Sequence, residues 1–249
     1  MDNLGQPAQV PAGHGAQTPL FNLISAHYIE LAPSAFTQLG DGAIAYHAPE
    51  TSAGGSTAVD FDQAAVVADG EILYSMNISD LAPGTYEWAR VSLTYQNYDV
   101  SFLASGMNMT GTVASFVGFN TYITEHTIKT ETLQVNDNKP QGYWAWETHP
   151  NQFLQSPIVN SGQAPATTVP NPLSATSPIP PGSCVVTGQF PTSLTITGNE
   201  TEDIIVELSF SINNSFEWSD ALDNNVFEPL DGDTVVDMGI RGLIPTVIQ

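Results

Sequence analysis

Positive charge is almost missing from this 249-residue sequence, which contains only four lysine and arginine residues: Arg90, Lys129, Lys139 and Arg241. Aspartate and glutamate number 26 and leave a formal net charge of −22. This acidic share is ordinary, because about a quarter of an average chain is charged. A surface so poor in cations cannot neutralise phosphate groups, so nucleic acid and anionic lipid are excluded as partners. Cations, neutral ligands such as sugars, and cation-rich protein surfaces remain.

Cysteine, long apolar runs and an export signal are also scarce or missing. The single cysteine, Cys184, excludes an internal disulfide, and its apolar neighbours Val185 and Val186 favour a buried structural thiol. No run approaches the ~18 apolar residues of a membrane span, so we expect no membrane insertion. Residues 1–10 lack the basic and apolar regions of a signal peptide. We expect an extracytoplasmic protein, secreted, periplasmic or at the cell surface, whose export segment was removed. Four Asn-x-Ser/Thr triplets fit that location: Asn77, Asn108, Asn199 and Asn213.

Alternating apolar residues predict an all-β fold. The clearest period of two lies at 203–213, where apolar side chains from Ile204 to Ile212 alternate with mostly polar ones. Residues 72–78 and 86–95 alternate in the same way. Further strands are predicted at 22–31, 57–67, 98–104, 109–117, 119–128, 130–136, 142–147, 184–190, 193–198 and 234–238. Short strands with frequent turn signals predict an antiparallel β-sandwich or jelly roll. The only helix candidate, 62–68, is short and β-branched.

A long uncharged segment interrupts the chain. Residues 148–199 contain no charged side chain, and eight prolines fall between Pro150 and Pro181. A flexible linker is usually richer in charge or in glycine and serine. We therefore predict a single domain of residues 1–249, with 148–183 as a Pro-rich loop that wraps across the sandwich. The alternative is two units, 1–147 and 184–249, joined by a linker.

Acidic residues concentrate near the C-terminus, where eleven of the 26 fall between Glu200 and Asp237. Crowded carboxylates repel one another, so a bound cation would relieve the cost. Alignment with a twelve-residue calcium loop places oxygen ligands at five positions, with two further acids as substitutes: Asp220, Asn224, Val226 (carbonyl), Glu228 and Asp231, then Asp223 and Asp233. Leu222 and Asn225 depart from the pattern at positions 3 and 6. The alternative is an acidic hairpin loop with Asx turns.

A second candidate metal site combines soft ligands. Met107 and Met109 share one face of a predicted strand, and with His126 and His149 they have the donor types that suit Cu(I). In residue types this set resembles the sites of small periplasmic copper carriers. The alternative is that the methionines fill the core.

The aromatic residues could form a binding surface, whereas the usual hydrolytic motifs are missing. Seven aromatic residues would suit stacking on sugar rings if exposed: Trp88, Trp144, Trp146, Trp218, Tyr95, Tyr98 and Tyr143. The alternative is that most of them belong to the core. No nucleophile elbow, zinc-protease helix or phosphate loop occurs. A glycoside-active enzyme needs only two carboxylates about 5–9.5 Å apart, which sequence alone does not test.

The C-terminal part of the chain resembles one group of bacterial envelope sequences. Ser215-Phe216-Glu217-Trp218-Ser219-Asp220, Phe227-Glu228-Pro229 and Val235-Val236-Asp237-Met238-Gly239 are similar to uncharacterised secreted or lipoprotein sequences of Bacteroidota. The resemblance implies a cell-envelope location and no particular activity.

Together these observations favour a non-catalytic binding or structural β domain, stabilised by calcium. Because the chain has few lysines to guard exposed strand edges, a homo-oligomer or filament is also expected. The alternatives are a copper-binding protein, a carbohydrate-binding module and a glycoside-active enzyme.

Overall fold

The computed structural model describes residues 9–149, 156–165, 180 and 182–248. These residues form sixteen strands, with a single 3-10 turn, η1, at Ile78–Asp80. The predicted all-β, antiparallel sandwich is confirmed. No helix in the described ranges has the length and apolar character required to cross a bilayer.

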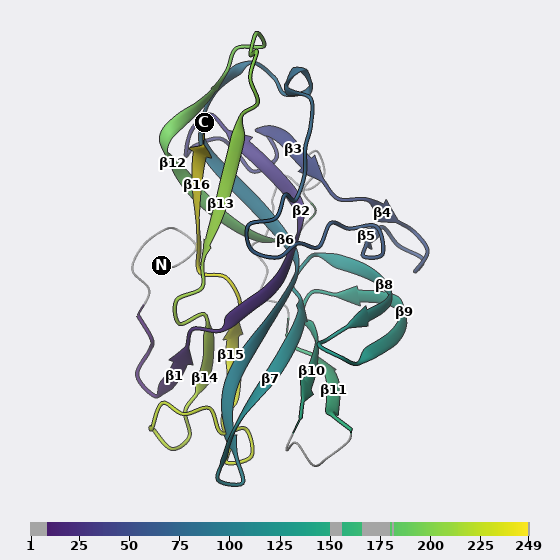
Figure 1. Cartoon of the computed structure of the whole chain (residues 1–249), viewed down its shortest axis with the longest axis vertical. Coiled ribbons are helices and arrows are strands. Elements are labelled where there is room, and N and C mark those ends of the chain that lie inside the picture. Colours follow the sequence, from purple (N-terminus) through teal and green to yellow (C-terminus); the bar gives the residue numbers. More distant parts are fainter. Residues whose placement is uncertain (1–8, 150–155, 166–179, 181, 249) are drawn as a thin grey trace.

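The largest sheet is built around β6, a strand of 21 residues at Gly84–Ala104. Strands follow the order β11, β10, β7, β6, β2 and β3, and β12 pairs with the N-terminal half of β6. In Figure 1, β6 runs along much of the length of the molecule. Its partners have these bounds: β2 Leu20–Ala32, β3 Ala43–His47, β7 Met107–Phe116, β10 Tyr143–Thr148, β11 Ile158–Gln163 and β12 Cys184–Ile196.

Three smaller sheets complete the described structure. The first contains β1 (His14–Gln17), β14 (Phe216–Ser219) and β15 (Thr234–Met238). The second pairs β13 (Ile205–Ser211) with β16 (Gly242–Ile248). The third contains β4 (Glu50–Thr51), β5 (Ala58–Asp60), β8 (Asn120–Thr127) and β9 (Thr132–Pro140). The short β5–β8 pair is parallel, and the other ladders among the described residues are antiparallel.

Strand β6 contributes to three clusters of buried apolar residues because it is long enough to pass from one to the next, and Tyr95 near its middle belongs to the cluster with β7, β8 and β10. Its N-terminal half packs with β12 and β16 in the upper part of Figure 1, through Ala89, Val91 and Leu93. Its C-terminal half packs with Phe216 and Trp218 of β14 in the lower part, through Tyr98, Val100 and Phe102. The two sets stand on opposite faces of the strand, since side chains alternate with a period of two. One strand therefore holds both ends of the molecule together.

The predicted strands agree with the structure where a partner strand is available. The predictions for 22–31, 109–117, 119–128, 130–136, 142–147, 203–213 and 234–238 are confirmed within a few residues. The pair 86–95 and 98–104 forms one strand, β6. The pair 184–190 and 193–198 also forms one strand, β12, whose ladder with β6 shifts between Gln189 and Leu194.

The predicted strand at 72–78 is wrong, most of the strand predicted at 57–67 is wrong, and several strands were missed. Residues 72–78 alternate but form no strand, and Ile72 is 80% exposed, because alternation alone supplies no ladder partner. Residues 62–68 form no helix, and only Ala58–Asp60 of the predicted strand 57–67 is extended in a ladder. The missed strands β1, β3, β4 and β14 are five residues or shorter, too short for a periodic signal. The missed strands β11 and β16 are longer.

The segment 148–183, predicted as a wrapping loop, is described only in part. Residues 158–163 form β11, which pairs antiparallel with β10. The prolines at 150, 170, 172, 178 and 181 lie outside the described residues. After this segment, β12 pairs with β6 and β14 pairs with β1, so strands on either side of it share two sheets.

Candidate functional site

The predicted calcium loop connects β14 to β15. Asp220, Glu228 and Asp233 are buried, whereas Asp223 and Asp231 are exposed. The buried carboxylates point into the loop, where its own backbone surrounds them.

Backbone N–H groups donate hydrogen bonds to both oxygens of two of these carboxylates. Asp220 accepts hydrogen bonds from the amides of Leu222 at 3.2 Å and Asn225 at 2.6 Å. Asp233 accepts from the amides of Ala221 at 2.9 Å and Glu228 at 2.7 Å. Buried polar groups need such partners. The loop therefore satisfies these two charges with its own backbone.

Asparagines shape the turn of this loop. The side chain of Asn224 donates to Glu228 at 2.7 Å and accepts from the amide of Val226 at 2.8 Å, which is an Asx turn. Asn225 has a φ of 56°, in the left-handed region that asparagine tolerates. Asn225 thus makes the turn that glycine makes in a calcium loop. The structure brings Asp220, Asn224, Glu228 and Asp233 into one hydrogen-bonded loop, and calcium binding there stays a prediction.

A different set of side chains converges more closely. Oε1 of Glu50 lies 2.9 Å from Nε2 of His27 and 3.2 Å from Nε2 of His47. Within the described ranges, these three residues are the one group of three His, Cys, Asp or Glu whose ligand atoms all lie within 4.8 Å of one another. The side chain of His27 is 1% exposed, whereas those of His47 and Glu50 are 43% and 30% exposed. The group is closed on one side and open to solvent on the other.

A β-bulge in β2 allows this convergence. Ala26 pairs with Leu93 of β6, but Tyr28 pairs with the adjacent Ser92, so His27 is an extra residue in the ladder. A bulge re-aims a side chain that regular alternation would send to the opposite face. The ring of His27 accordingly lies beside that of Tyr28, with centroids 4.2 Å apart. Tyr28 pairs in register with His47 of β3, which places both histidines next to Glu50.

The electrostatics of the group follow from its unequal burial. Burial lowers the pKa of His27, and the hydrogen bond to Glu50 opposes this only in part. The hydrogen bond from His27 lowers the pKa of Glu50, although burial opposes the shift. At neutral pH His27 is therefore a neutral imidazole beside an ionised carboxylate.

Sequence reasoning missed this group because the five histidines are scattered along the chain. The only local signal is the spacing of His47 and Glu50, which flank the Ala48-Pro49 turn between β3 and β4. His27 joins them through strand register and a bulge, and neither can be read from a single sequence.

The structure places the proposed copper ligands in separate environments. Met107 is exposed near the start of β7, and Met109 is half-buried against the core that contains Phe102. His126 is buried among the rings of another core, and burial lowers its pKa to about 4. His149 bonds to Glu147 at 3.0 Å. Met109 and His126 thus belong to different clusters, and copper binding stays a prediction.

The predicted sugar platform is not exposed as a whole. Four of its members are buried: Trp218, Tyr95, Tyr98 and Tyr143. Trp88, Trp144 and Trp146 are half-buried. Trp144 and Trp218 lie over Gly162 and Gly15 on neighbouring strands, where any larger residue would collide with the indole. These tryptophans pack in the sheets, in agreement with the alternative that most of the aromatic residues belong to the core.

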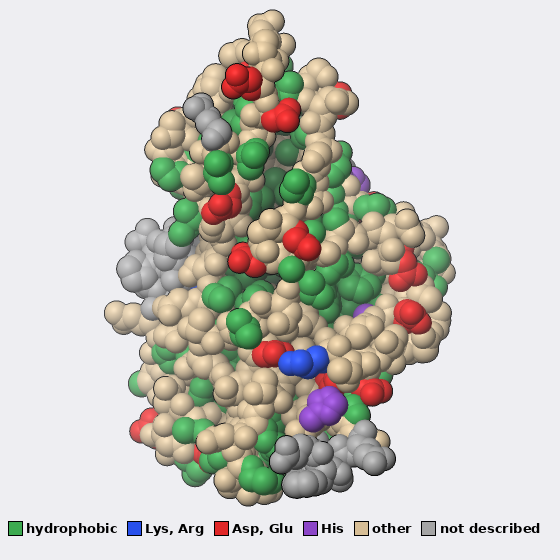
Figure 2. Space-filling model, in the orientation of Figure 1, with side chains coloured by type: hydrophobic (Ala, Val, Ile, Leu, Met, Phe, Trp, Pro, Cys, Tyr) green, Lys and Arg blue, Asp and Glu red, His purple; other side chains and the backbone are tan. Residues whose placement is uncertain are grey.

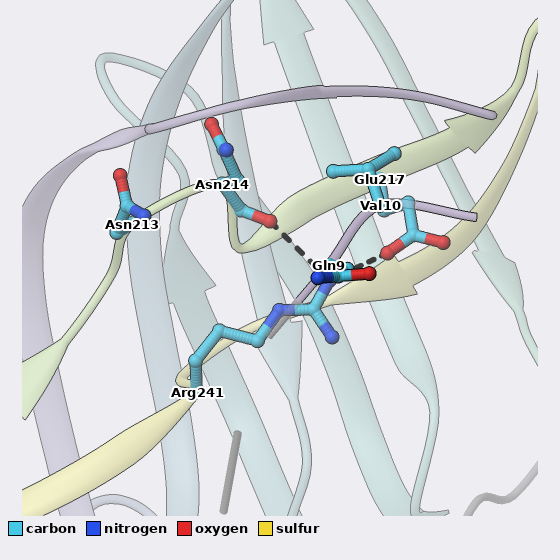
Figure 3. A pocket seen from close by; sticks show the side chains of 6 residues that line it. All are labelled: Gln9, Val10, Asn213, Asn214, Glu217 and Arg241. Carbon is cyan, nitrogen blue, oxygen red and sulfur yellow. Dashed lines mark hydrogen bonds and ion pairs between the residues drawn. The ribbon is translucent and has the colours of Figure 1, made fainter. Parts of the chain in front are cut away.

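Two hollows of very different size remain. The larger is an open one of about 430 Å³, lined by Phe61, Asp62 and residues 124–127. Figure 3 shows a hollow around Arg241, whose guanidinium donates to Glu217 at 2.8 Å and to the carbonyl of Asn214 at 3.3 Å. The hollow has a volume of about 20 Å³, enough for about one water. Cys184 is half-buried, and burial raises the pKa of its thiol to about 11, so the thiol is protonated at neutral pH.

Comparisons with known protein families, with curated proteins and with solved structures find no match to this chain.

Proposed function

We propose that the protein is a non-catalytic structural and binding β domain of the extracytoplasmic space that associates with copies of itself through a free strand edge. The location is supported by the scarcity of lysine and arginine and by the resemblance of residues 215–239 to envelope proteins. Figure 2 shows acidic side chains scattered over a largely uncharged surface.

The observation that carries the proposal is the β13 edge, residues 205–211. On one side β13 pairs with β16, and on the other it has no ladder partner in the described part of the chain. Its outward face is apolar at one end, because Ile205 is 57% exposed and pairs with Ile248, which is 40% exposed. Polar residues follow on the same face of β13: Glu207, Ser209 and Ser211.

Natural proteins usually guard such an edge. Lysine, proline, a bulge or an inward charge prevents a second strand from pairing. The β13 edge has no lysine or proline and a single charged residue, Glu207. A second copy is a suitable occupant, because two identical edges pair antiparallel around a two-fold axis and satisfy each other's backbone groups.

Net charge opposes this association in a way that can be measured. Two copies of charge −22 repel each other in dilute buffer. The screening length falls from about 10 Å at 0.1 M salt to about 3 Å at 1 M, so added salt weakens the repulsion. Association is therefore expected to increase with salt, as is usual for contacts between like-charged apolar surfaces.

Light scattering coupled to size exclusion, at low and high salt, tests the proposal. The native chain is expected to form dimers or larger species at high salt, and Ile205→Lys is expected to remain monomeric. Ile72→Lys is the matched control, because Ile72 is also an exposed isoleucine, at 80%, but lies outside any strand. A native chain that stays monomeric at every salt concentration would refute self-association. Equal assembly of both variants would refute the role of the β13 edge.

A further inference from the structure

The group of His27, His47 and Glu50 comes close to the dimensions of a zinc site, because its three ligand atoms lie within 4.8 Å of one another. Ligand atoms about 2.0–2.1 Å from a tetrahedral zinc ion lie about 3.3 Å from one another. Oε1 of Glu50 lies 2.9 Å and 3.2 Å from the two Nε2 atoms, already close to that spacing. A small outward movement of the exposed Glu50 and His47 side chains would make room for an ion.

From this geometry we infer that His27, His47 and Glu50 bind Zn²⁺, with water in the fourth position. Two imidazole nitrogens and one carboxylate oxygen form a donor set that zinc accepts in proteins. Calcium takes oxygen ligands, and Cu(I) prefers sulfur. The solvent-exposed side of the group leaves the fourth position open.

The ligands are held in place before a metal arrives. His27 is buried in the β2 bulge, and its carbonyl accepts from the amide of Ala48 at 2.8 Å, which ties the β3–β4 turn to β2. The ring of His47 stacks on Tyr28, with centroids 4.4 Å apart and an angle of 17° between the planes. Rigid ligands lose little conformational entropy on binding.

Zinc binding requires a proton rearrangement at both histidines. Each ring must offer its Nε2 lone pair to the metal, so a hydrogen on that atom moves to Nδ1 or leaves to solvent. Two neutral imidazoles and one carboxylate leave the zinc site with a net charge of +1, which the strongly negative chain offsets.

One missing contact limits the expected affinity. Metal-bound histidines usually donate their second ring N–H to an acceptor, which tightens the site. Nδ1 of His27 is buried and has no hydrogen-bond partner among the described residues. The site is therefore expected to exchange zinc with solution and not to hold it as a permanent structural ion.

The test is metal titration of the full chain after treatment with a chelator. Co²⁺ alone, added first, reports tetrahedral nitrogen and oxygen coordination through its visible absorption, and Zn²⁺ is then measured by displacement of Co²⁺. The native chain is expected to bind one ion. Because loss of a mere supporting contact costs about 10–100-fold in affinity, loss of a ligand in Glu50→Gln or His47→Gln is expected to cost more than about 100-fold.

The control is His14→Gln. His14 also bonds to a glutamate, with its Nδ1 2.6 Å from Oε1 of Glu217, but no described His, Cys, Asp or Glu joins this pair as a third ligand. The variant is expected to bind zinc like the native chain. Three results would each overturn the inference: no Co²⁺ or Zn²⁺ bound by the native chain, native affinity in both Glu50→Gln and His47→Gln, or an equal loss in His14→Gln. Both ligand variants change partly exposed side chains, and circular dichroism verifies their fold.

Discussion

The acidic loop at 220–233 and the region from β2 to β4 both give their carboxylates close polar partners, but the partners differ. In the loop, Asp220 and Asp233 accept hydrogen bonds from backbone amides. In the β2–β4 region, Glu50 faces two imidazoles and Glu30 faces a guanidinium. The many acids along residues 220–233 predict a metal site in the loop. The side chains that face each carboxylate favour a different metal ligand, Glu50, because two imidazoles lie beside it.

Glu30 is a buried carboxylate that forms an ion pair with Arg90, one of the four lysine and arginine residues of the chain. It is fully buried, and its Oε1 accepts from the amides of Gly40 and Gly42 at 2.8 Å and 2.7 Å. Its Oε2 accepts from Arg90 at 3.2 Å. Arg90 also donates to the carbonyls of Thr37 and Gln38, so the pair fixes the loop between β2 and β3.

The largest expected effect comes from removing this cation. Arg90→Met leaves the charge of Glu30 buried without its side-chain partner, and such a loss costs about 3–5 kcal/mol of the free energy of unfolding. Urea denaturation measures it. The double variant Glu30→Gln with Arg90→Met is expected to recover part of the loss, because no uncompensated charge remains. A cost below about 1 kcal/mol in the single variant would show that the amides of Gly40 and Gly42 stabilise the Glu30 charge without Arg90.

The second prediction uses pH to probe a carboxylate held by amides. Burial alone would raise the pKa of Glu147, but hydrogen bonds from the Thr130 hydroxyl and from the amides of Glu131, Thr130 and Lys129 outweigh it and lower the pKa to about 2. A folded pKa below the ordinary value of 4.5 stabilises the native state above pH 4.5, and this contribution is lost as pH falls toward 2. The fall corresponds to about 3 kcal/mol.

The matching variant is Glu147→Gln. It is expected to be less stable than the native chain at neutral pH and to approach native stability near pH 2, measured as urea midpoints across the pH range. Parallel stability curves for the two proteins would contradict the assigned pKa.

The smallest expected effect is the difference in stability between two variants of the loop, one at a buried acid and one at an exposed acid. Asp233→Ala removes the acceptor of two amides, those of Ala221 and Glu228, and is expected to cost about 1–3 kcal/mol. Asp231→Ala, two residues away, removes an exposed side chain and is expected to change stability by no more than about 0.5 kcal/mol. Thermal melts of the two variants measure this difference in stability. Equal midpoints would show that Asp233 does not stabilise the loop.

The same melts test the calcium prediction. A ligand that binds only the native state stabilises it by about 2.7 kcal/mol at 100 times its dissociation constant. If calcium binds the loop, the native midpoint rises with calcium relative to chelator, and Asp233→Ala reduces the rise. If the melting midpoint of the native chain is the same with calcium and with chelator, the prediction that the loop binds calcium is wrong.

Much of the fold was accessible from sequence because its signals are local. The alternation at 203–213 coincides with β13, and the apolar run at 184–186 opens β12. The alternation at 72–78 is equally clear and yields no strand, since extended residues need a neighbour to satisfy their backbone groups. The pairing of β6 with β2, β7 and β12 is non-local and leaves no mark in any single window.

The candidate site was less accessible for the same reason. The acidic loop is contiguous, so its residues could be named from sequence, although the direction in which Asp220 and Asp233 point could not. His27 and Glu50 are 23 residues apart and meet because a bulge re-aims one side chain. A one-residue change of register would separate them.

The sequence by itself determined the all-β class and the scarcity of cations, because composition and two-residue periodicity are properties of short windows. Only the tertiary structure decided which acids meet amides, which meet Arg90 and which meet imidazoles. Those pairings depend on strand register and on the bulge at His27, and register is set by the packing of the whole molecule.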